Sequence, residues 1–290
     1  MVGSSPEDIL MQVRQPVQVV TAQKVTDGAG VHIRRAIGTP LLEDLDPFLL
    51  LDEFRNDDPA QYVAGFPDHP HRGIETVTYM LAGAMRHGDN QGNSGRLGPG
   101  DVQWMTAGRG IIHSEMPEQE EGLLWGFQLW VNLSADEKMS APCYREIDSV
   151  EIPEVARDDG VRVKVISGEL DGVTGAVNGI AVSPTYMDVT LPAGCTFTHQ
   201  FPTGHAAFTY VFEGAAEVGK GMEAHTVKRG QVAVFGPGDE AQLSADETPA
   251  RVLLVAGRPH REPIVKYGPF VMNTREQIVE AIDDFRAGRF

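Results

Sequence analysis

The chain has 290 residues and a formal net charge of −17, with 24 Lys and Arg against 41 Asp and Glu. Its hydrophobic content of 41% is that of a globular protein with a real core, and its length allows one large domain or two of ordinary size. A chain this acidic repels a phosphate backbone and an anionic membrane surface. Direct binding to nucleic acid or to a membrane is therefore not expected.

Nothing in the sequence resembles a targeting or membrane-spanning segment. The first 15 residues, MVGSSPEDILMQVRQ, contain Glu7 and Asp8 and no long apolar run, unlike a signal peptide. No stretch reaches the roughly 18 apolar residues of a transmembrane helix. Cys143 and Cys195 lie far apart and outside any metal-binding spacing, which indicates reduced thiols. We expect a cytoplasmic protein, or a nuclear one if the source is a eukaryote.

Short β-type runs recur along the chain between Gly and Pro residues, and helical periodicity is missing until the end. Many short strands separated by turn residues are typical of a β-sandwich or barrel. The sequence therefore predicts an all-β fold. The expected strands cover residues 17–21, 31–35, 48–52, 76–81, 102–105, 126–131, 161–166, 186–191, 207–212, 231–235 and 251–256.

The first motif is GFPDHPHRGIE, residues 65–75, which holds His69 and His71 at i and i+2. Side chains at this spacing point the same way on an extended strand, and Pro70 between them stiffens an extended backbone. Taken alone, such a pair is more often a turn or surface feature than a pair of metal ligands.

The second motif is GPGDVQWMTAGRGIIHSEMP, residues 98–117, in which His113 and Glu115 repeat the i, i+2 spacing. If the two motifs form adjacent strands, three imidazoles and one carboxylate converge inside a barrel. Such a nitrogen and oxygen donor set suits a divalent transition metal, whether Fe, Mn, Ni, Co, Cu or Zn. The residues predict a metal site and leave the choice of metal open.

Other residues near these motifs have two interpretations. Arg72 and Arg109 could hold an anionic substrate or form hydrogen bonds that stabilise turns. Trp104, Trp125 and Trp130 lie on expected strands, where core packing is the favoured interpretation.

An internal repeat divides the chain. TVTYMLAG at residues 76–83 is similar to AFTYVFEG at residues 207–214, and each is followed by a glycine-containing turn. The polar segment 134–160 is the expected boundary. The sequence thus predicts two similar barrels in tandem: an N-terminal metal-binding unit at residues 1–135, a connecting segment at 136–160 and a C-terminal unit at 161–290.

The second unit lacks equivalents of the metal ligands and is expected to support the first. His199, His205 and His225 are interpreted as surface or packing residues, and the segment GQVAVFGPGDEAQLSA contains no His-x-Glu. Aligning the two repeats places Gln200, Pro202 and Ala206 where His69, His71 and Glu75 stand.

The C-terminal end is the one segment with helical character. Thr274 and Gln277 form a capping-box pattern, and Ile278, Ile282 and Phe285 follow on one face. We expect a helix over residues 275–287 that docks its apolar face on a sheet.

Long stretches of the chain resemble the pirin family of bicupins. They are FPDHPHRGIETVTY, PGDVQWMTAGRGIIHSEMP, FQLWVNL and REPIVKYGPFVMNT, together with the earlier RRAIGT and LDPFLLLDEF. The resemblance covers nearly the whole chain. It implies two cupin barrels of the jelly-roll type, with one metal in the N-terminal barrel.

By this resemblance the metal ligands are His69, His71, His113 and Glu115, and the metal is iron(II). Glu75 is a rival for the carboxylate position, because general cupin motifs place a glutamate ligand shortly after His-x-His. Glu115 is preferred here, with Glu75 either as a pocket group or as a carboxylate that orients a ligating histidine.

Some pirins resemble quercetin 2,3-dioxygenases, which open a flavonol with O2 and release CO. The resemblance then implies a small aromatic substrate and a catalytic role for Glu115 as acceptor of the substrate's hydroxyl proton. The alternative is a metal-binding regulatory protein that acts on transcription or on metabolic enzymes through protein partners. A sugar-phosphate isomerase would need a Lys- and Arg-rich pocket, which the sequence does not reveal.

Overall fold

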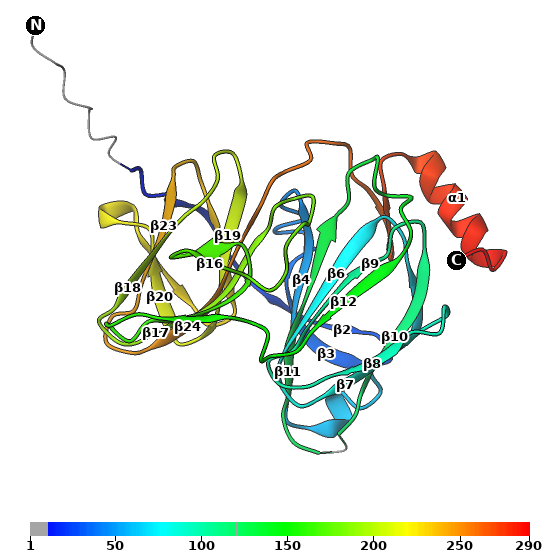
Figure 1. The fold of residues 1–290 in the computed structure, drawn as a ribbon, viewed down its shortest axis with the longest axis horizontal. Coiled ribbons are helices and arrows are strands. Elements are labelled where there is room, and N and C mark those ends of the chain that lie inside the picture. Colours follow the sequence, from blue (N-terminus) through cyan, green and yellow to red (C-terminus); the bar gives the residue numbers. More distant parts are fainter. Residues whose placement is uncertain (1–10, 120) are drawn as a thin grey trace, which may run out of the picture.

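The computed structural model describes residues 11–119 and 121–290. The chain folds into two β-barrels that lie side by side, and one α-helix, α1 (Arg275–Arg286), ends the described chain beside the first barrel (Figure 1). Each barrel pairs a seven-stranded sheet with a four-stranded sheet. The all-β class and the arrangement of two tandem barrels with a C-terminal helix are confirmed.

The first barrel is built mainly from the N-terminal half of the chain. Its seven-stranded sheet has the order β12-β9-β6-β11-β4-β3-β2, and its four-stranded sheet has the order β5-β10-β7-β8. The strands are β2 (Gln23–Asp27), β3 (Val31–Ile37), β4 (Phe48–Asn56), β5 (Phe66–His71), β6 (Ile74–Ala82), β7 (Met85–Asp89), β8 (Ser94–Leu97), β9 (Val102–Thr106), β10 (Ile111–Pro117), β11 (Leu124–Asn132) and β12 (Cys143–Ile147).

The second barrel repeats this plan with the orders β1-β22-β19-β24-β17-β14-β13 and β18-β23-β20-β21. A small two-stranded sheet, β15-β16, stands apart. The strands are β1 (Pro16–Thr21), β13 (Glu154–Ala156), β14 (Arg162–Ser167), β15 (Glu169–Leu170), β16 (Val173–Thr174), β17 (Thr185–Leu191), β18 (Thr196–Gln200), β19 (Ala206–Glu213), β20 (Ala215–Val218), β21 (His225–Lys228), β22 (Gln231–Phe235), β23 (Glu240–Ser244) and β24 (Ala250–Gly257).

Both ends of the chain cross to the opposite barrel. Strand β1 pairs with β22 in the second barrel, whereas the hairpin of β25 (Val265–Tyr267) and β26 (Phe270–Met272) returns to the first, where Val271 packs with Leu49 and Ile74. The connecting segment is divided as well, since β12 pairs with β9 and β13 pairs with β14. The boundaries at residues 135 and 160 therefore stay a prediction. The N-terminal strand belongs to the second barrel, and the C-terminal hairpin packs on the first.

The outer faces of the two seven-stranded sheets form one continuous core between the barrels. Two buried tyrosines from the internal repeat cross this interface in opposite directions. The Tyr79 hydroxyl donates to Asp188 in the second barrel at 2.7 Å, and the Tyr210 hydroxyl donates to Glu53 in the first barrel at 2.8 Å. The repeat seen in the sequence thus marks the strands by which the barrels hold each other.

All eleven strands expected from the sequence are present, and most extend one or two residues further. The helix is also confirmed. The hydroxyl of Thr274 accepts from the Gln277 backbone amide, while the Gln277 side chain accepts from the Thr274 amide. Ile278 is buried and Phe285 packs against Phe270 of β26, so the helix covers the C-terminal hairpin. Within the described residues, no helix is long and apolar enough to cross a membrane.

Candidate metal centre

Three histidines meet inside the first barrel, on the two adjacent strands β5 and β10. The strands are antiparallel, with His113 opposite His69 and Ile111 opposite His71. The ligand nitrogens of the three histidines all lie within 4.8 Å of one another. The expectation that the two motifs form neighbouring strands and bring these side chains together holds in the structure.

The hydrogen bonds of these histidines fit a metal ion. Neither ring nitrogen of His71 or of His113 has a hydrogen-bond partner among the described residues, although both side chains are buried. His69 Nδ1 lies 2.8 Å from the Pro67 carbonyl oxygen, which holds the proton on Nδ1 and leaves the Nε2 lone pair free. Buried polar atoms are nearly always paired, so these unpartnered nitrogens are suited to act as ligands of a metal ion.

The electrostatics of the cluster favour neutral imidazoles, the form that binds metals. Burial lowers the pKa of His113 to about 3, and the neighbouring His69 adds to the shift. Burial, together with the neighbouring His113 and His69, lowers the pKa of His71 well below its ordinary value. Both side chains are thus ready to coordinate without first releasing a proton.

Glu115 lies on the same strand as His113 and lines the same cavity, but its carboxylate is not a member of the group of three histidines. Gln128 Nε2 donates to Glu115 Oε2 at 3.1 Å, and the Thr78 hydroxyl lies 2.9 Å from Oε1 and 2.5 Å from the Gln128 oxygen. The single hydroxyl proton serves one of these two acceptors. The structure therefore places Glu115 beside the cluster, oriented by Gln128, and its role as a ligand stays a prediction.

Glu75 faces away from the cavity and from the histidines, so the expectation that it is a pocket group or orients a ligand is wrong. Its carboxylate accepts from Thr106 at 2.8 Å, on the side of the sheet that faces the second barrel. The strand ends after His71 and restarts at Ile74, because Gly73 adopts a φ of 81° with the Val271 carbonyl close by. This break reverses the alternation, and Thr78 rather than Glu75 faces inward.

Arg72 is a structural residue and not a substrate anchor. Its Nε donates to the Arg109 carbonyl at 2.5 Å, and its guanidinium forms an ion pair with Asp284 of α1 at 2.8 Å. The Phe290 ring stacks over the same guanidinium. The buried cation directly after His71 therefore fixes the C-terminal helix against the histidine strand, as the turn-stabilising interpretation predicted.

A second buried cation, missed by the sequence analysis, holds the other side of this turn. Lys138 Nζ donates to the carbonyls of Gly73 and Val271 and to the side-chain oxygen of Asn132, all within 2.9 Å. Burial lowers the pKa of Lys138 to about 8. Because Lys138 lies in the polar connecting segment, no pattern in the sequence distinguished it from a solvated lysine.

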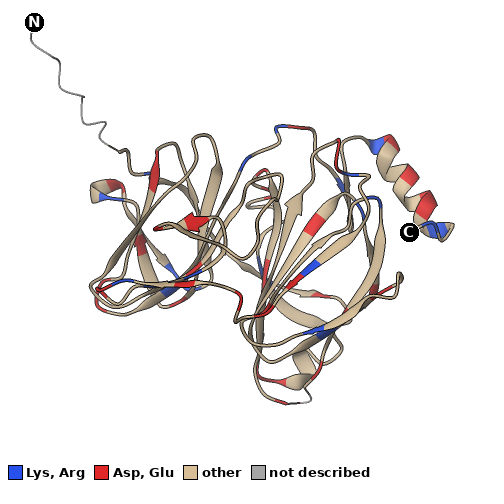
Figure 2. Cartoon of the chain, viewed as in Figure 1, with Lys and Arg blue, Asp and Glu red and all other residues tan. Residues whose placement is uncertain are grey.

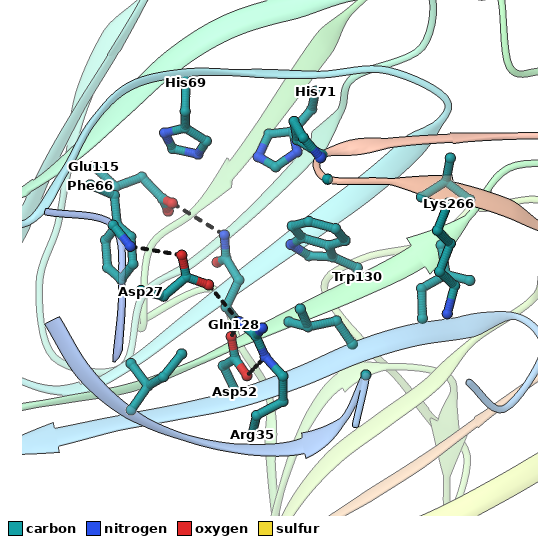
Figure 3. A pocket seen from close by; sticks show the side chains of 18 of the residues that line it. Asp27, Arg35, Asp52, Phe66, His69, His71, Glu115, Gln128, Trp130 and Lys266 are labelled. Carbon is teal, nitrogen blue, oxygen red and sulfur yellow. Dashed lines mark hydrogen bonds and ion pairs between the residues drawn. The ribbon is translucent and has the colours of Figure 1, made fainter. Parts of the chain in front are cut away.

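The histidines open into a cavity of about 980 Å³ in the first barrel. Figure 3 shows His69 and His71 at one end and Arg35 with Asp52 at the other, with Gln128 and Trp130 between them. The apolar part of the cavity wall is formed by Ile33, Leu49, Leu50, Phe54, Phe66, Met85, Trp130, Ile264 and Val271.

The tryptophans divide between core and cavity. Trp104 and Trp125 pack in the core between the barrels, as expected. Trp130 instead lines the cavity, and its ring meets that of His71 edge to face at 5.1 Å.

The second barrel has no comparable centre within the described part of the chain. His199 is buried, stacks on Phe197 and meets Phe201 edge to face, and the residue opposite it on β23 is Ala241. His225 is exposed. These contacts agree with the interpretation of packing and surface histidines.

Comparison with known proteins gives consistent matches. Two sequence-family models match, Pirin over residues 30–131 and Pirin C-terminal cupin domain over residues 186–290. A pirin-like protein of Caulobacter vibrioides is 52% identical over 97% of this chain and 100% of its own length. Human pirin is 46% identical over 92% of this chain and 90% of its own. A crystal structure of quercetin 2,3-dioxygenase from Acinetobacter baumannii superposes with a TM-score of 0.88 at 35% identity, covering 96% of this chain and 98% of that one.

Proposed function

This chain belongs to the pirin family, and from that premise we propose that it is a metal-dependent dioxygenase that opens a flavonol such as quercetin with O2 and releases CO. The observation that carries the proposal is the convergence of three imidazoles, two of them buried and without hydrogen-bond partners among the described residues, at one end of a cavity of about 980 Å³. A site of this kind can present an ion to a ligand the size of a flavonol.

The proposed ligands are His69, His71, His113 and Glu115, and the proposed metal is iron(II), with Mn, Ni, Co, Cu or Zn as alternatives. The donor set suits any of these ions. When bound, the metal would supply a Lewis acid that lowers the pKa of the substrate's 3-hydroxyl.

Glu115 is the residue we assign to accept the hydroxyl proton. It lines the cavity next to the histidines, and its carboxylate is held by Gln128 Nε2 and by the Thr78 hydroxyl. A general base must lie within hydrogen-bond reach of its proton, and these two contacts fix where the carboxylate stands. They also leave it able to exchange partners, because each contact is a single hydrogen bond.

The walls of the cavity supply binding and exclude water. Leu49, Phe66 and Trp130 offer apolar surface, and the rings of Phe66 and Trp130 suit a planar aromatic ring system. The reaction balances without any further reagent. Both atoms of O2 are added to the flavonol, the heterocycle opens, and one ring carbon leaves as CO to give an ester of two phenolic rings.

The experiment is to purify the protein anaerobically, load it with Fe(II), and follow the loss of flavonol absorbance and the release of CO on admission of air. The proposal expects metal-dependent turnover with one CO released per flavonol consumed. Absence of turnover with each of Fe, Mn, Ni, Co and Cu would contradict it for flavonols.

A second candidate is a regulatory protein that uses the metal site without turnover and acts through a protein partner. The net charge of −17 favours it, since an acidic surface suits docking on a basic partner. Figure 2 shows acidic residues on many elements, including several along α1. A metal-loaded protein that never consumes a flavonol yet binds a basic partner at low salt would support this candidate over the first.

A further inference from the structure

A continuous row of polar side chains crosses the inner face of the first barrel. The cross-strand register places Gln128 opposite Thr78 on one side and opposite Asp52 on the other. Thr78 and Gln128, which contact Glu115, thus belong to one row with Asp52. Its members, in order across β9, β6, β11, β4 and β3, are Gln103, Thr78, Gln128, Asp52 and Arg35.

The far end of the row is a fixed ion triad. Arg35 donates through Nε and Nη2 to both oxygens of Asp52, at 2.8 and 2.7 Å, and through Nη2 to Asp27 at 2.6 Å. Asp52 is buried, whereas the side chain of Asp27 is 49% exposed at the cavity wall. Two of the three guanidinium nitrogens are thus committed to carboxylates, and the triad as a whole carries a charge of −1.

The cavity lining as a whole is also negatively charged. Six carboxylates and two cations line it, so its net charge is −4 with the histidines neutral, and a divalent metal would leave it at −2. An anionic ligand would be repelled here, whereas carboxylate oxygens accept strong hydrogen bonds from hydroxyl groups. The carboxylates are Asp27, Glu43, Asp44, Asp52, Asp68 and Glu115, and the cations are Arg35 and Lys266.

We propose that the Arg35–Asp52–Asp27 triad is the specificity site of this cavity, where Asp27 and Asp52 accept hydrogen bonds from phenolic hydroxyls on the end of the substrate that points away from the histidines. The substrate class is then an uncharged aromatic with hydroxyl donors at its distal end, and carboxylated or phosphorylated aromatics are excluded. This proposal rests on the proposed function, which supplies the flavonol scaffold.

Three features of the triad suit this role. Arg35 and Asp52 lie on the cavity wall away from the histidine end, with Trp130 and Gln128 between, and Asp27 lies beside them on the side of Phe66 (Figure 3). Arg35 holds the two carboxylates in fixed positions, so little freedom is lost when a hydroxyl binds. A site built to accept hydrogen bonds discriminates against ligands that lack the hydroxyl, since such ligands displace water from the carboxylates without replacing its hydrogen bonds.

The test compares three probes that share the 3-hydroxy-4-keto unit: quercetin, 3-hydroxyflavone without other hydroxyls, and 3-hydroxyflavone carrying a carboxylate on its phenyl ring. Binding to the full-length protein with its metal is measured under argon, without turnover, by quenching of tryptophan fluorescence. Quercetin is expected to bind roughly tenfold to hundredfold more tightly than 3-hydroxyflavone, as for hydrogen bonds to charged groups, and the carboxylated probe more weakly than both.

Two variants, Asp27→Asn and Asp52→Asn, locate the effect. Each variant should bind quercetin more weakly than the wild type does and should bind 3-hydroxyflavone with unchanged affinity. Asp27 is half-exposed, so its variant remains informative if the Asp52 variant fails to fold. The matched control is Asp44→Asn, which removes another cavity carboxylate, paired with Lys266 at 3.0 Å outside the triad. It should leave the ratio of quercetin to 3-hydroxyflavone affinity unchanged.

Equal affinity of the wild type for quercetin and 3-hydroxyflavone would overturn the proposal. So would triad variants that bind neither probe, because the triad would then be structural. These outcomes are independent of turnover. Selective binding without CO release would contradict only the dioxygenase function, whereas turnover without selectivity would contradict only the assignment of the triad.

Discussion

The two barrels differ most along one row of side chains that crosses each seven-stranded sheet at the same register. Thr78 and Thr209 occupy matching positions of the internal repeat, and the strands beside them match as well. In the first barrel the row is Gln103, Thr78, Gln128, Asp52 and Arg35, whereas in the second it is Ala233, Thr209, Leu254, Met187 and Val165.

The shared threonine shows how the neighbours set the role of a residue. The Thr78 hydroxyl contacts Glu115 of the four-stranded sheet and Gln128 on the neighbouring strand, whereas the Thr209 hydroxyl donates to the Leu253 carbonyl on the next strand. Apolar side chains fill the second barrel around it. The same backbone plan thus gives a binding cavity in one copy and a packed support in the other, and the difference lies in a few inward-facing positions.

The largest expected effect comes from removing one histidine from each barrel. His113→Ala should abolish metal retention and turnover, because it takes away a ligand, and even outer partners of ligands cost roughly 10- to 100-fold in metal affinity. His199→Ala in the second barrel should keep both. Elemental analysis of the purified variants measures the metal content. An equal loss of metal in both variants would contradict the assignment of the metal site to the first barrel.

The next largest effect comes from giving each barrel the residue that the other barrel has at the central position of the row. Leu254→Gln buries an amide among apolar side chains and should lower the free energy of unfolding by about 2–4 kcal/mol. The opposite change, Gln128→Leu, keeps the three histidine ligands and should lower kcat roughly 10- to 100-fold, since Glu115 loses its amide donor.

Urea unfolding and flavonol kinetics on both proteins check this pair. A Leu254→Gln protein as stable as the wild type would show that the second barrel is not tightly packed. A Gln128→Leu protein with full activity would remove Gln128 from the proposed site.

A smaller, pH-dependent effect is expected at His199. Burial lowers its pKa to about 4, with Arg157 adding to the shift and Asp171 opposing it. Between pH 6.5 and 4 the unfolded chain binds a proton that the folded chain does not, so acid destabilises the fold by about 1.4 kcal/mol per pH unit.

The measurement is the free energy of unfolding at pH 7 and pH 5 for the wild type and His199→Gln. The variant should lose less stability on acidification, by about 2 kcal/mol at pH 5. Identical pH dependence would show that His199 is charged or solvated in the folded protein.

The smallest effect separates the two tyrosines at the interface. Among the described residues, Tyr210→Phe leaves buried Glu53 with the Trp125 indole as its one side-chain donor and should cost about 2 kcal/mol. Tyr79→Phe leaves Asp188 with two bonds from Arg251 and should cost about 1 kcal/mol. Thermal unfolding of the two variants would reveal the order, and the reverse order would contradict this account of the interface.

The parts of the fold that alternate regularly could be predicted from the sequence. Hydrophobic strands between glycine turns, the repeat, and the Thr274 cap are local patterns, and each appears where expected. The histidine pairs could also be placed, because i, i+2 spacing fixes a common face on a strand.

The remaining features depend on contacts between distant segments. Glu75 was misplaced because Gly73 interrupts the strand and reverses its alternation. Arg35 and Asp52 are 17 positions apart, and only the pairing of β3 with β4 joins them. The exchange of chain ends between the barrels leaves no local pattern at all. Register and crossover are properties of the whole sheet, so a single sequence does not reveal them.

The most direct test of the account is an anomalous-scattering map from crystals of the protein loaded with iron(II). The account predicts one metal per chain in the first barrel, at about 2 Å from nitrogens of His69, His71 and His113, with a Glu115 oxygen turned toward it. An empty first barrel, or a metal bound in the second, would contradict it.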